Sequence, residues 1–404
     1  MLSLVTFISP AIGLVLILWI GFTQVGKAIP SNIKILAMPI ALCIAQLGYV
    51  QTSSASDLQR YYENLQYYGG SLGSILKNDS QALYLRDLLM YLVHRSGDER
   101  LLPYIVGFVI YWIVFYILFD MVDRNRDLLK PRDVICMILI IFGITFPTTA
   151  IGNIRFVTAS MIISFATYRD LIQKKRGLIT LLLYIVPIFL HTEAVFILLI
   201  RVMQGVARRI GLWSILVVFF IPSLVYIANN HLSLIPGSIL KSAVQRAEFY
   251  LSWNEGGFAT TLKSDPINLV TRWYGTFFIL YVLGLILYSV KKKDRIKILD
   301  QPMVGYVFLV GVFGLACLNI TTGAFWRFET IFAVLCPIYL IPIKKLHTRA
   351  VGIPIKLLLI SILISIANNV RFTYWNYRLS KMAVEYFVGS GITIIVDFFK
   401  MIFM

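Results

Sequence analysis

Long apolar runs separated by short polar linkers recur along the whole chain. Several runs approach the length of about 20 residues that an α-helix needs to cross a bilayer. The pattern predicts an all-α integral membrane protein, a polytopic helical bundle of about 12–13 transmembrane segments. The predicted spans are 2–22, 33–50, 103–119, 134–149, 154–168, 178–190, 192–203, 212–228, 269–290, 303–320, 324–342 and 350–367, with a further segment at 384–403 for which the sequence does not decide whether it spans.

Lysine and arginine collect in six of the short linkers, which hold 21 of the 37 such residues. Because basic residues are enriched in cytoplasmic loops, these linkers are predicted to face the cytoplasm. The other linkers alternate with them and face outward. Two outward linkers are long, at about 51–102 and 229–268, and are rich in Tyr, Ser, Asn and Gly. The basic linkers are 22–34, 120–133, 169–176, 201–209, 291–300 and 342–350.

The apolar run 178–203 is basic at both flanks and carries His191 and Glu193 in its middle. Flanks on one side of the membrane require the chain to enter and return. We therefore predict a short helical hairpin whose turn lies in the outer part of the bilayer, since an arm of about 13 residues rises only about 20 Å. The alternative is one continuous helix of about 26 residues. Residues 81–94 are too short to cross and are predicted to form an interfacial or re-entrant helix on the outer side.

Composition agrees with a membrane protein that forms a single polytopic domain, 1–404. Hydrophobic residues make up 58% of the chain and charged residues 14%, against about 25% charged in soluble proteins. The net charge of +17 is explained by the basic linkers, so no nucleic-acid partner is expected. The segment 2–22 has no basic start and is expected to be a retained span. The four cysteines lie in apolar runs as packing residues.

Ionisable side chains inside a bilayer cost free energy and usually mark a site. In the predicted topology they are few and all lie in the outward half, which favours a chamber that opens outward and disfavours an ion-coupled transporter. More ordinary roles are snorkelling of an arginine at a helix end, or a structural ion pair, although residues two apart on a helix do not face each other. The residues concerned are Arg155, His191, Glu193, Arg272, Arg327 and Glu329.

The outward segments interleave aromatic residues with arginines, amides and carboxylates. Aromatic faces can lie against sugar rings, while arginines and amides bind phosphate and hydroxyl groups. Interfacial aromatic belts explain part of the pattern but not the charges within it. The sequence contains no nucleotide-binding loop and no metalloprotease, hydrolase or DxD motif, so neither a cofactor nor a metal is expected. The segments are QRYYENLQYYGG (59–70), QRAEFYLSWNEGGF (245–258) and RFTYWNYRLS (371–380).

Several short motifs occur in an order typical of one known family. They are Asp57 with Tyr61 in an outer loop, Asn153-x-Arg155 at the head of a span, His191 at the end of a short apolar helix, Arg246 with Tyr250 in the large outer loop, and Arg327-Phe328 near a late span. Over most of the chain this order resembles the EpsG/Wzy group of bacterial polysaccharide polymerases, the O-antigen polymerase family.

The resemblance implies a multi-pass protein of the bacterial inner (plasma) membrane. Its activity would be that of a lipid-diphosphate-dependent glycosyltransferase, which joins undecaprenyl-diphosphate-linked oligosaccharide repeat units at the periplasmic or outer face. The product would be O-antigen of lipopolysaccharide, capsule or exopolysaccharide. The expected partners are the lipid-linked oligosaccharide, the lipid bilayer, a chain-length regulator and a flippase, and no cofactor is implied.

Such a reaction needs positive charge where the diphosphate leaves and a base near the acceptor hydroxyl. We expect Arg155 and Arg327 to bind the diphosphate, and His191 or Glu193, with Asp57 as an alternative, to act as the base. The expected substrate-binding residues are Asp57, Arg60, Tyr61, Arg246, Tyr250, Trp253, Arg272 and Arg371. A flippase for lipid-linked oligosaccharide and an O-antigen ligase are the alternative functions, but a flippase should carry charges along a cavity that reaches both leaflets.

Overall fold

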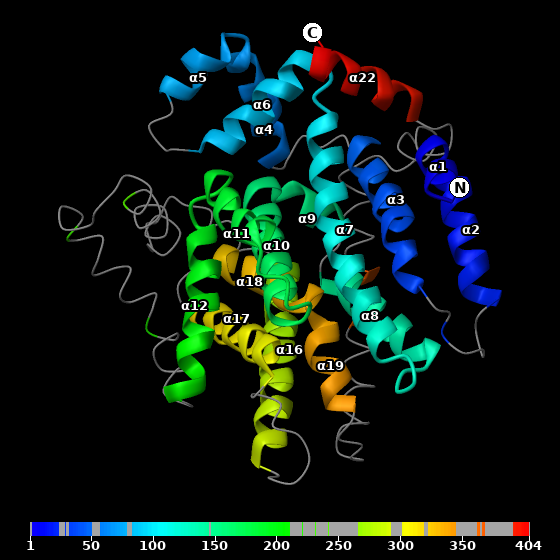
Figure 1. The fold of residues 1–404 in the computed structure, drawn as a ribbon, viewed down its shortest axis with the longest axis vertical. Coiled ribbons are helices and arrows are strands. Elements are labelled where there is room, and N and C mark those ends of the chain that lie inside the picture. Colours follow the sequence, from blue (N-terminus) through cyan, green and yellow to red (C-terminus); the bar gives the residue numbers. More distant parts are fainter. Residues whose placement is uncertain are drawn as a thin grey trace. The chain divides into compact units, whose positions relative to one another are not determined.

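Figure 1 shows the protein as a computed structural model in which helices dominate. The structure describes residues 2–23, 29, 32–50, 57–78, 83–144, 147–210, 220, 231, 241, 266–291, 301–318, 322–344, 362–363, 366–367 and 391–403. Within these residues every regular element is a helix and no strand occurs. The predicted all-α class is therefore confirmed for the described chain.

Two compact units divide the chain, residues 1–162 with 366–404 and residues 163–365, and the division falls within α10 (Ile154–Leu171). The first unit contains α1 (Leu2–Ile8), α2 (Pro10–Thr23), η1 (Ile33–Leu36), α3 (Ala37–Val50), α4 (Asp57–Leu65), η2 (Gln66–Tyr68), α5 (Leu72–Asn78), α6 (Tyr84–Ser96), α7 (Leu101–Arg124), α8 (Pro131–Ile144), α9 (Pro147–Gly152) and α22 (Gly391–Phe403). The second contains α11 (Leu178–Ile185), η3 (Val186–Phe189), α12 (Ala194–Ile210), α16 (Pro266–Lys291), α17 (Pro302–Leu318), α18 (Thr322–Val334) and α19 (Cys336–Lys344).

Two helical segments of the described chain are long and apolar enough to cross a membrane. They are Ile33–Val50, with 18 residues, and α7, with 24 residues. A third candidate is the pair α18 and α19, which is bent by 53° between Phe325–Val334 and Cys336–Lys344. At about 1.5 Å per residue, α7 rises about 36 Å, enough for the hydrocarbon core of about 30 Å. These segments agree with the predicted membrane class, and the larger number of spans stays a prediction.

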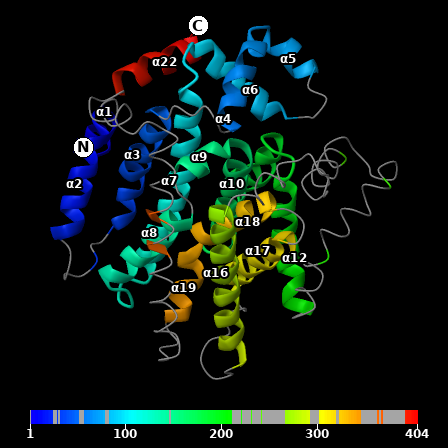
Figure 2. The ribbon, with the colours of Figure 1, turned by 180° about the vertical axis from the view of Figure 1, so that it is seen from behind.

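The helices α3 and α7 pack closely in the first unit. Figure 2, which views the protein from behind, shows them side by side. Small residues make this approach possible. A Cβ built on Gly48 of α3 would lie 2.8 Å from the carbonyl oxygen of Pro103, and one on Gly107 of α7 would lie 3.4 Å from the Cα of Ala45. Such small-residue contacts are the usual way in which membrane helices associate, because lipid offers no hydrophobic drive between them.

The long linker 51–102, which is predicted to face outward, contains more helix than its sequence suggests. From residue 57 on, the described part folds into α4, η2, α5 and α6. Tyr68 Oη donates a hydrogen bond of 2.9 Å to Asp87 Oδ1, and Arg86 forms an ion pair of 2.6 Å with the same carboxylate. The helix predicted at 81–94 is observed as α6, which ends where Gly97 adopts φ 73°, a conformation that favours glycine.

The run 178–203 is a helical hairpin in the second unit. α11 and η3 form the first arm, the chain turns at residues 190–193, and α12 forms the second arm. At the start of the first arm, Arg169 Nε donates to Thr180 Oγ1 at 3.3 Å, and on the second arm Arg201 forms an ion pair with Asp170. One continuous helix would place Thr180 and Arg201 about 32 Å apart, so their contacts with the adjacent residues Arg169 and Asp170 exclude that alternative.

Candidate functional site

A buried ion pair joins the hairpin to a distant helix of the second unit. Arg327 Nη1 on α18 donates a hydrogen bond of 2.9 Å to Glu193 Oε2, directly before α12. The two side chains are only 13% and 9% exposed. Arg327 therefore pairs with a residue 134 positions away, and not with Glu329, two positions along its own helix. The structure thus brings together two of the predicted catalytic residues.

Aromatic packing sets the positions of the two charged groups. Phe196, one turn after Glu193, lies 6.2 Å from Phe313 of α17, measured between ring centroids. Phe313 in turn lies 4.6 Å from Phe328, the residue next to Arg327, with the rings edge to face. The three rings form an aromatic layer that links α12, α17 and α18. Because close-packed rings fix the rotation of each helix, they hold the guanidinium and the carboxylate within reach of each other.

The turn before α12 carries three consecutive buried polar residues, His191, Thr192 and Glu193. The backbone N–H of Glu193 donates to His191 Nδ1 at 3.2 Å, and the backbone N–H of His191 donates to the carbonyl oxygen of Pro187 at 3.1 Å. The Thr192 hydroxyl is buried and has no hydrogen-bond partner among the residues the structure describes. The side chain of His191 therefore stabilises the turn, and the polar groups of the turn lie next to the ion pair.

Arg155 occupies a second position, in the first unit. It lies in the first turn of α10, and its Cζ is 5.2 Å from the centre of the Tyr61 ring on α4. Its Nε is buried and makes no hydrogen bond within the described chain. A guanidinium on an aromatic face gains cation–π attraction without using its N–H donors. The Nε–H of Arg155 is therefore not used by the described chain and suits the binding of an anion. The contact also brings together two predicted site residues, Arg155 and Tyr61.

The remaining predicted residues are placed in part. Arg60 is exposed on α4, beside Tyr61. Asp57 begins α4 and Arg272 lies in the first half of α16. The side chains of these two residues are outside the described part of the chain, as are Arg246, Tyr250, Trp253 and Arg371 as a whole.

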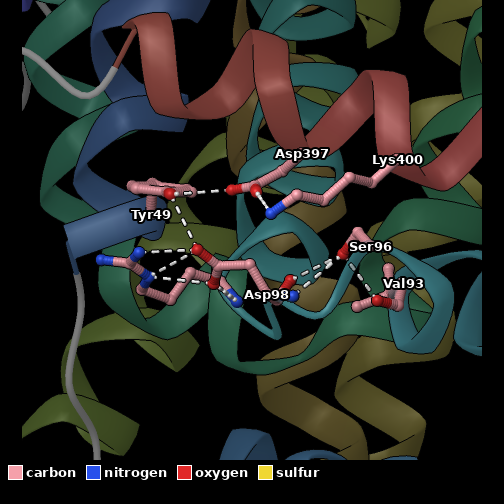
Figure 3. Close-up of polar contacts among 7 residues, drawn as sticks. Tyr49, Val93, Ser96, Asp98, Asp397 and Lys400 are labelled. Atoms are coloured by element: carbon pink, nitrogen blue, oxygen red, sulfur yellow. Dashed lines mark hydrogen bonds and ion pairs between the residues drawn. The ribbon is translucent and has the colours of Figure 1, made fainter.

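A polar cluster in the first unit was missed by the sequence analysis, and Figure 3 shows it. Tyr49 Oη lies 2.9 Å from Asp98 Oδ2 and 3.3 Å from Asp397 Oδ2 of α22. Arg100 binds Asp98 through two side-chain nitrogens, and Lys400 lies 3.5 Å from Asp397. A tyrosine hydroxyl carries one hydrogen, so both contacts are favourable only when one carboxyl is protonated. An aspartate within the apolar stretch GITIIVDFF was the available signal.

The two carboxyls differ in their tendency to ionise. Burial alone would raise the pKa of Asp98, but hydrogen bonds from the side chain and backbone of Arg100 outweigh it and hold that pKa below its ordinary value. Asp397 is paired less closely, with Lys400 Nζ at 3.5 Å. The proton of the pair therefore belongs on Asp397, which attaches α22.

A second cluster lies at the end of the hairpin away from its turn. Asp170, at the end of α10, accepts hydrogen bonds from Arg176 Nε at 2.7 Å and from Arg201 of α12. Tyr184 Oη of α11 lies 3.4 Å from the same carboxylate. Burial alone would raise the pKa of Asp170, but the two arginines outweigh it and hold the pKa below its ordinary value. The basic residues predicted to mark the cytoplasmic side thus also tie the hairpin to α10.

Comparison with known proteins adds one match. The family model described as the EpsG family matches residues 33–380, which is most of the chain and includes every predicted site residue. No curated protein and no solved structure matches the chain.

Proposed function

We propose, because the chain belongs to the EpsG family, that it is a polysaccharide polymerase which acts on lipid-linked repeat units. Membership of the family points to a polymerase-type glycosyltransferase in a membrane. The finer proposal is that the substrates are undecaprenyl-diphosphate-linked oligosaccharides, joined at the outer face of the bacterial plasma membrane into O-antigen, capsule or exopolysaccharide. A flippase would deliver the units, and a chain-length regulator would act on the product.

The reaction exchanges one bond at the anomeric carbon of the growing chain. The bond from this carbon to the diphosphate oxygen breaks, and its electron pair leaves on undecaprenyl diphosphate. A bond forms from the same carbon to a hydroxyl oxygen of the incoming unit, whose proton passes to a base. The diphosphate linkage is already activated, so the transfer needs no nucleotide. The protein must stabilise the departing negative charge, accept a proton and align two large substrates.

The observation that carries the proposal is the buried Arg327 beside Glu193. A guanidinium has five N–H donors in a planar fork, so a carboxylate and a phosphate can share it. Within a membrane the local dielectric constant is low, and a cation fixed in advance stabilises developing negative charge more strongly than it would in water. We assign Arg327 to the leaving diphosphate and Glu193 to the proton of the acceptor hydroxyl, with His191 and Asp57 as the alternative bases.

Arg155, in the first unit, is assigned to phosphate binding through its position on the Tyr61 ring. The ring positions the guanidinium, and its Nε is buried without a hydrogen bond among the described residues, which suits a phosphate oxygen. Tyr61 itself, or a neighbouring aromatic residue, would lie against a sugar ring. The other assignments are to substrate binding: Arg60, Arg246, Tyr250, Trp253, Arg272 and Arg371.

The test is polymerisation by the purified full chain in lipid vesicles, supplied with a diphosphate-linked repeat unit and with neither nucleotide nor divalent metal. We expect a product ladder on a gel that is spaced by one repeat unit. Arg327→Ala and Arg155→Ala should each reduce the rate at least about 100-fold, the usual loss when one charge-stabilising donor is removed. Arg126→Ala is the control, since this arginine is 43% exposed in a linker between helices.

The alternatives predict different products. Absence of a ladder, together with appearance of the lipid-linked unit in the opposite leaflet, would identify a flippase and refute the proposal. Transfer of one finished chain to a different lipid acceptor, without a ladder, would identify a ligase. A ladder that forms at a normal rate in Arg327→Ala would keep the polymerase but remove the assigned role of Arg327.

A further inference from the structure

The imidazole of His191 is already engaged in the turn before α12. Its Nδ1 accepts the backbone N–H of Glu193 at 3.2 Å, and the residue is 2% exposed. We propose that His191 is a positioning residue, whose Nδ1 caps this turn and thereby holds Glu193 beside Arg327, and that it is not the proton acceptor of the reaction. The proposal rests on the proposed function and assigns roles within the same site.

The tautomer of the ring follows from this hydrogen bond. A backbone N–H can only donate, so Nδ1 must present a lone pair, and in a neutral imidazole the single ring hydrogen then lies on Nε2. A proton on Nδ1 would point at the N–H hydrogen of Glu193 and break the bond. The turn therefore selects the neutral ring with hydrogen on Nε2, a form that donates through this nitrogen.

A general base needs an accessible lone pair within reach of the proton that it abstracts. The lone pair of His191 is on Nδ1, which is occupied by Glu193 and buried. Proton uptake there would leave a buried backbone N–H without an acceptor and loosen the turn in the step that requires most precision. The proton of the acceptor hydroxyl then falls to a carboxylate, and Glu193 is the carboxylate that this turn positions.

The geometry explains why a histidine side chain suits this position. It stands two residues before the amide that it caps, as aspartate or asparagine does in the turns that those residues stabilise. Unlike aspartate, it brings no second negative charge next to Glu193. It therefore caps the turn without weakening the attraction between Glu193 and Arg327.

The test compares two substitutions that mimic different nitrogens of the ring. The Oδ1 atom of asparagine lies at the same position along the side chain as Nδ1, whereas glutamine reaches the position of Nε2 and cannot cap the turn in the same way. We expect His191→Asn to recover most of the kcat that His191→Gln and His191→Ala lose, and to keep the acid limb of the pH–rate profile of the unmodified protein. A base role predicts losses of about 100-fold or more in all three variants and a lost acid limb.

A second measurement needs no activity. The chain has four histidines, so nitrogen-15 labelling of histidine in vesicles gives a spectrum in which His191 is identified by its loss in His191→Asn. We expect a proton on Nε2 and none on Nδ1 across neutral pH. A ring protonated on Nδ1 would overturn the proposal. If the protein formed no ladder at all, the proposed function would fail while the tautomer would still decide whether His191 caps the turn.

Discussion

Removal of either partner of the Arg327–Glu193 pair should destabilise the protein. Removal of both partners should lower the free energy of unfolding little more than removal of one partner does. At 2.9 Å, the Coulomb attraction is about 6 kcal/mol for an effective dielectric constant of about 20 and about 1.4 kcal/mol in water. Desolvation of both groups opposes this attraction. Each single change leaves one charge buried and uncompensated, which typically costs about 3–5 kcal/mol.

The experiment is a double-mutant cycle with Arg327→Met, Glu193→Gln and the combined variant. Unfolding of the full chain is titrated with a denaturing detergent in mixed micelles, and the free energy of unfolding is compared among the four proteins. Because the double variant leaves no buried charge at this position, we expect a coupling free energy of about 3 kcal/mol. The control cycle uses Arg126 and Asp123, which lie 3.8 Å apart and are 43% and 20% exposed.

Exposed pairs typically contribute about 0.2–1 kcal/mol, and this partly exposed control pair should stay near that range. The coupling free energy of the buried pair should therefore clearly exceed that of the control pair. A coupling free energy below about 0.5 kcal/mol for Arg327 and Glu193 would mean that the two charges are separately solvated, and would refute the buried pair as the element that holds the hairpin turn to α18.

Three further changes test other parts of the structure in the same titration. A Cβ on Gly275 would overlap the buried carboxyl of Glu329, so Gly275→Ala should cost about 1–3 kcal/mol. Gly284→Ala, in the same helix with nothing within 4 Å, should be neutral or stabilising by up to about 1 kcal/mol. The pKa of Asp170 is lowered on folding. Ionised Asp170 therefore stabilises the protein above the unfolded pKa of about 3.9, and this stabilisation is lost as pH falls through the folded pKa. Asp170→Asn should reduce the fall in the free energy of unfolding at acid pH.

The apolar pattern was sufficient to predict helices because the bilayer leaves few other solutions for the backbone. It also favoured the hairpin over one continuous helix, since basic flanks at both ends of the run 178–203 indicate a chain that returns to the same side of the membrane. It could not identify the partner of Glu193. Helical periodicity relates residues three or four positions apart, whereas this contact joins positions 193 and 327 and depends on how α12 packs against α17 and α18.

The helical content of the linker 51–102 was underestimated for a related reason. Its helices are short, and α4 with 9 residues and α5 with 7 fall below the length at which periodicity is distinctive. Isolated helices of this length are marginal in water and depend on tertiary contacts. The contact of Tyr68 with Asp87 is one such interaction. The spacing of residues along one chain does not indicate such pairings between short helices.

Burial of an ionisable side chain in a membrane protein costs free energy, and this cost constrains how the helices pack. Each buried charge needs a partner, so the few that are present fix the helices that carry them. On the second arm of the hairpin, Glu193 is tied to α18 and Arg201 to α10, and the helix rises about 12 Å over the eight positions from Glu193 to Arg201. This arm cannot slide or rotate without breaking one of the two ion pairs. A turn anchored in this way can hold a carboxylate and a guanidinium at a fixed separation, which is the condition that the proposed transfer between two large lipid-linked substrates would impose.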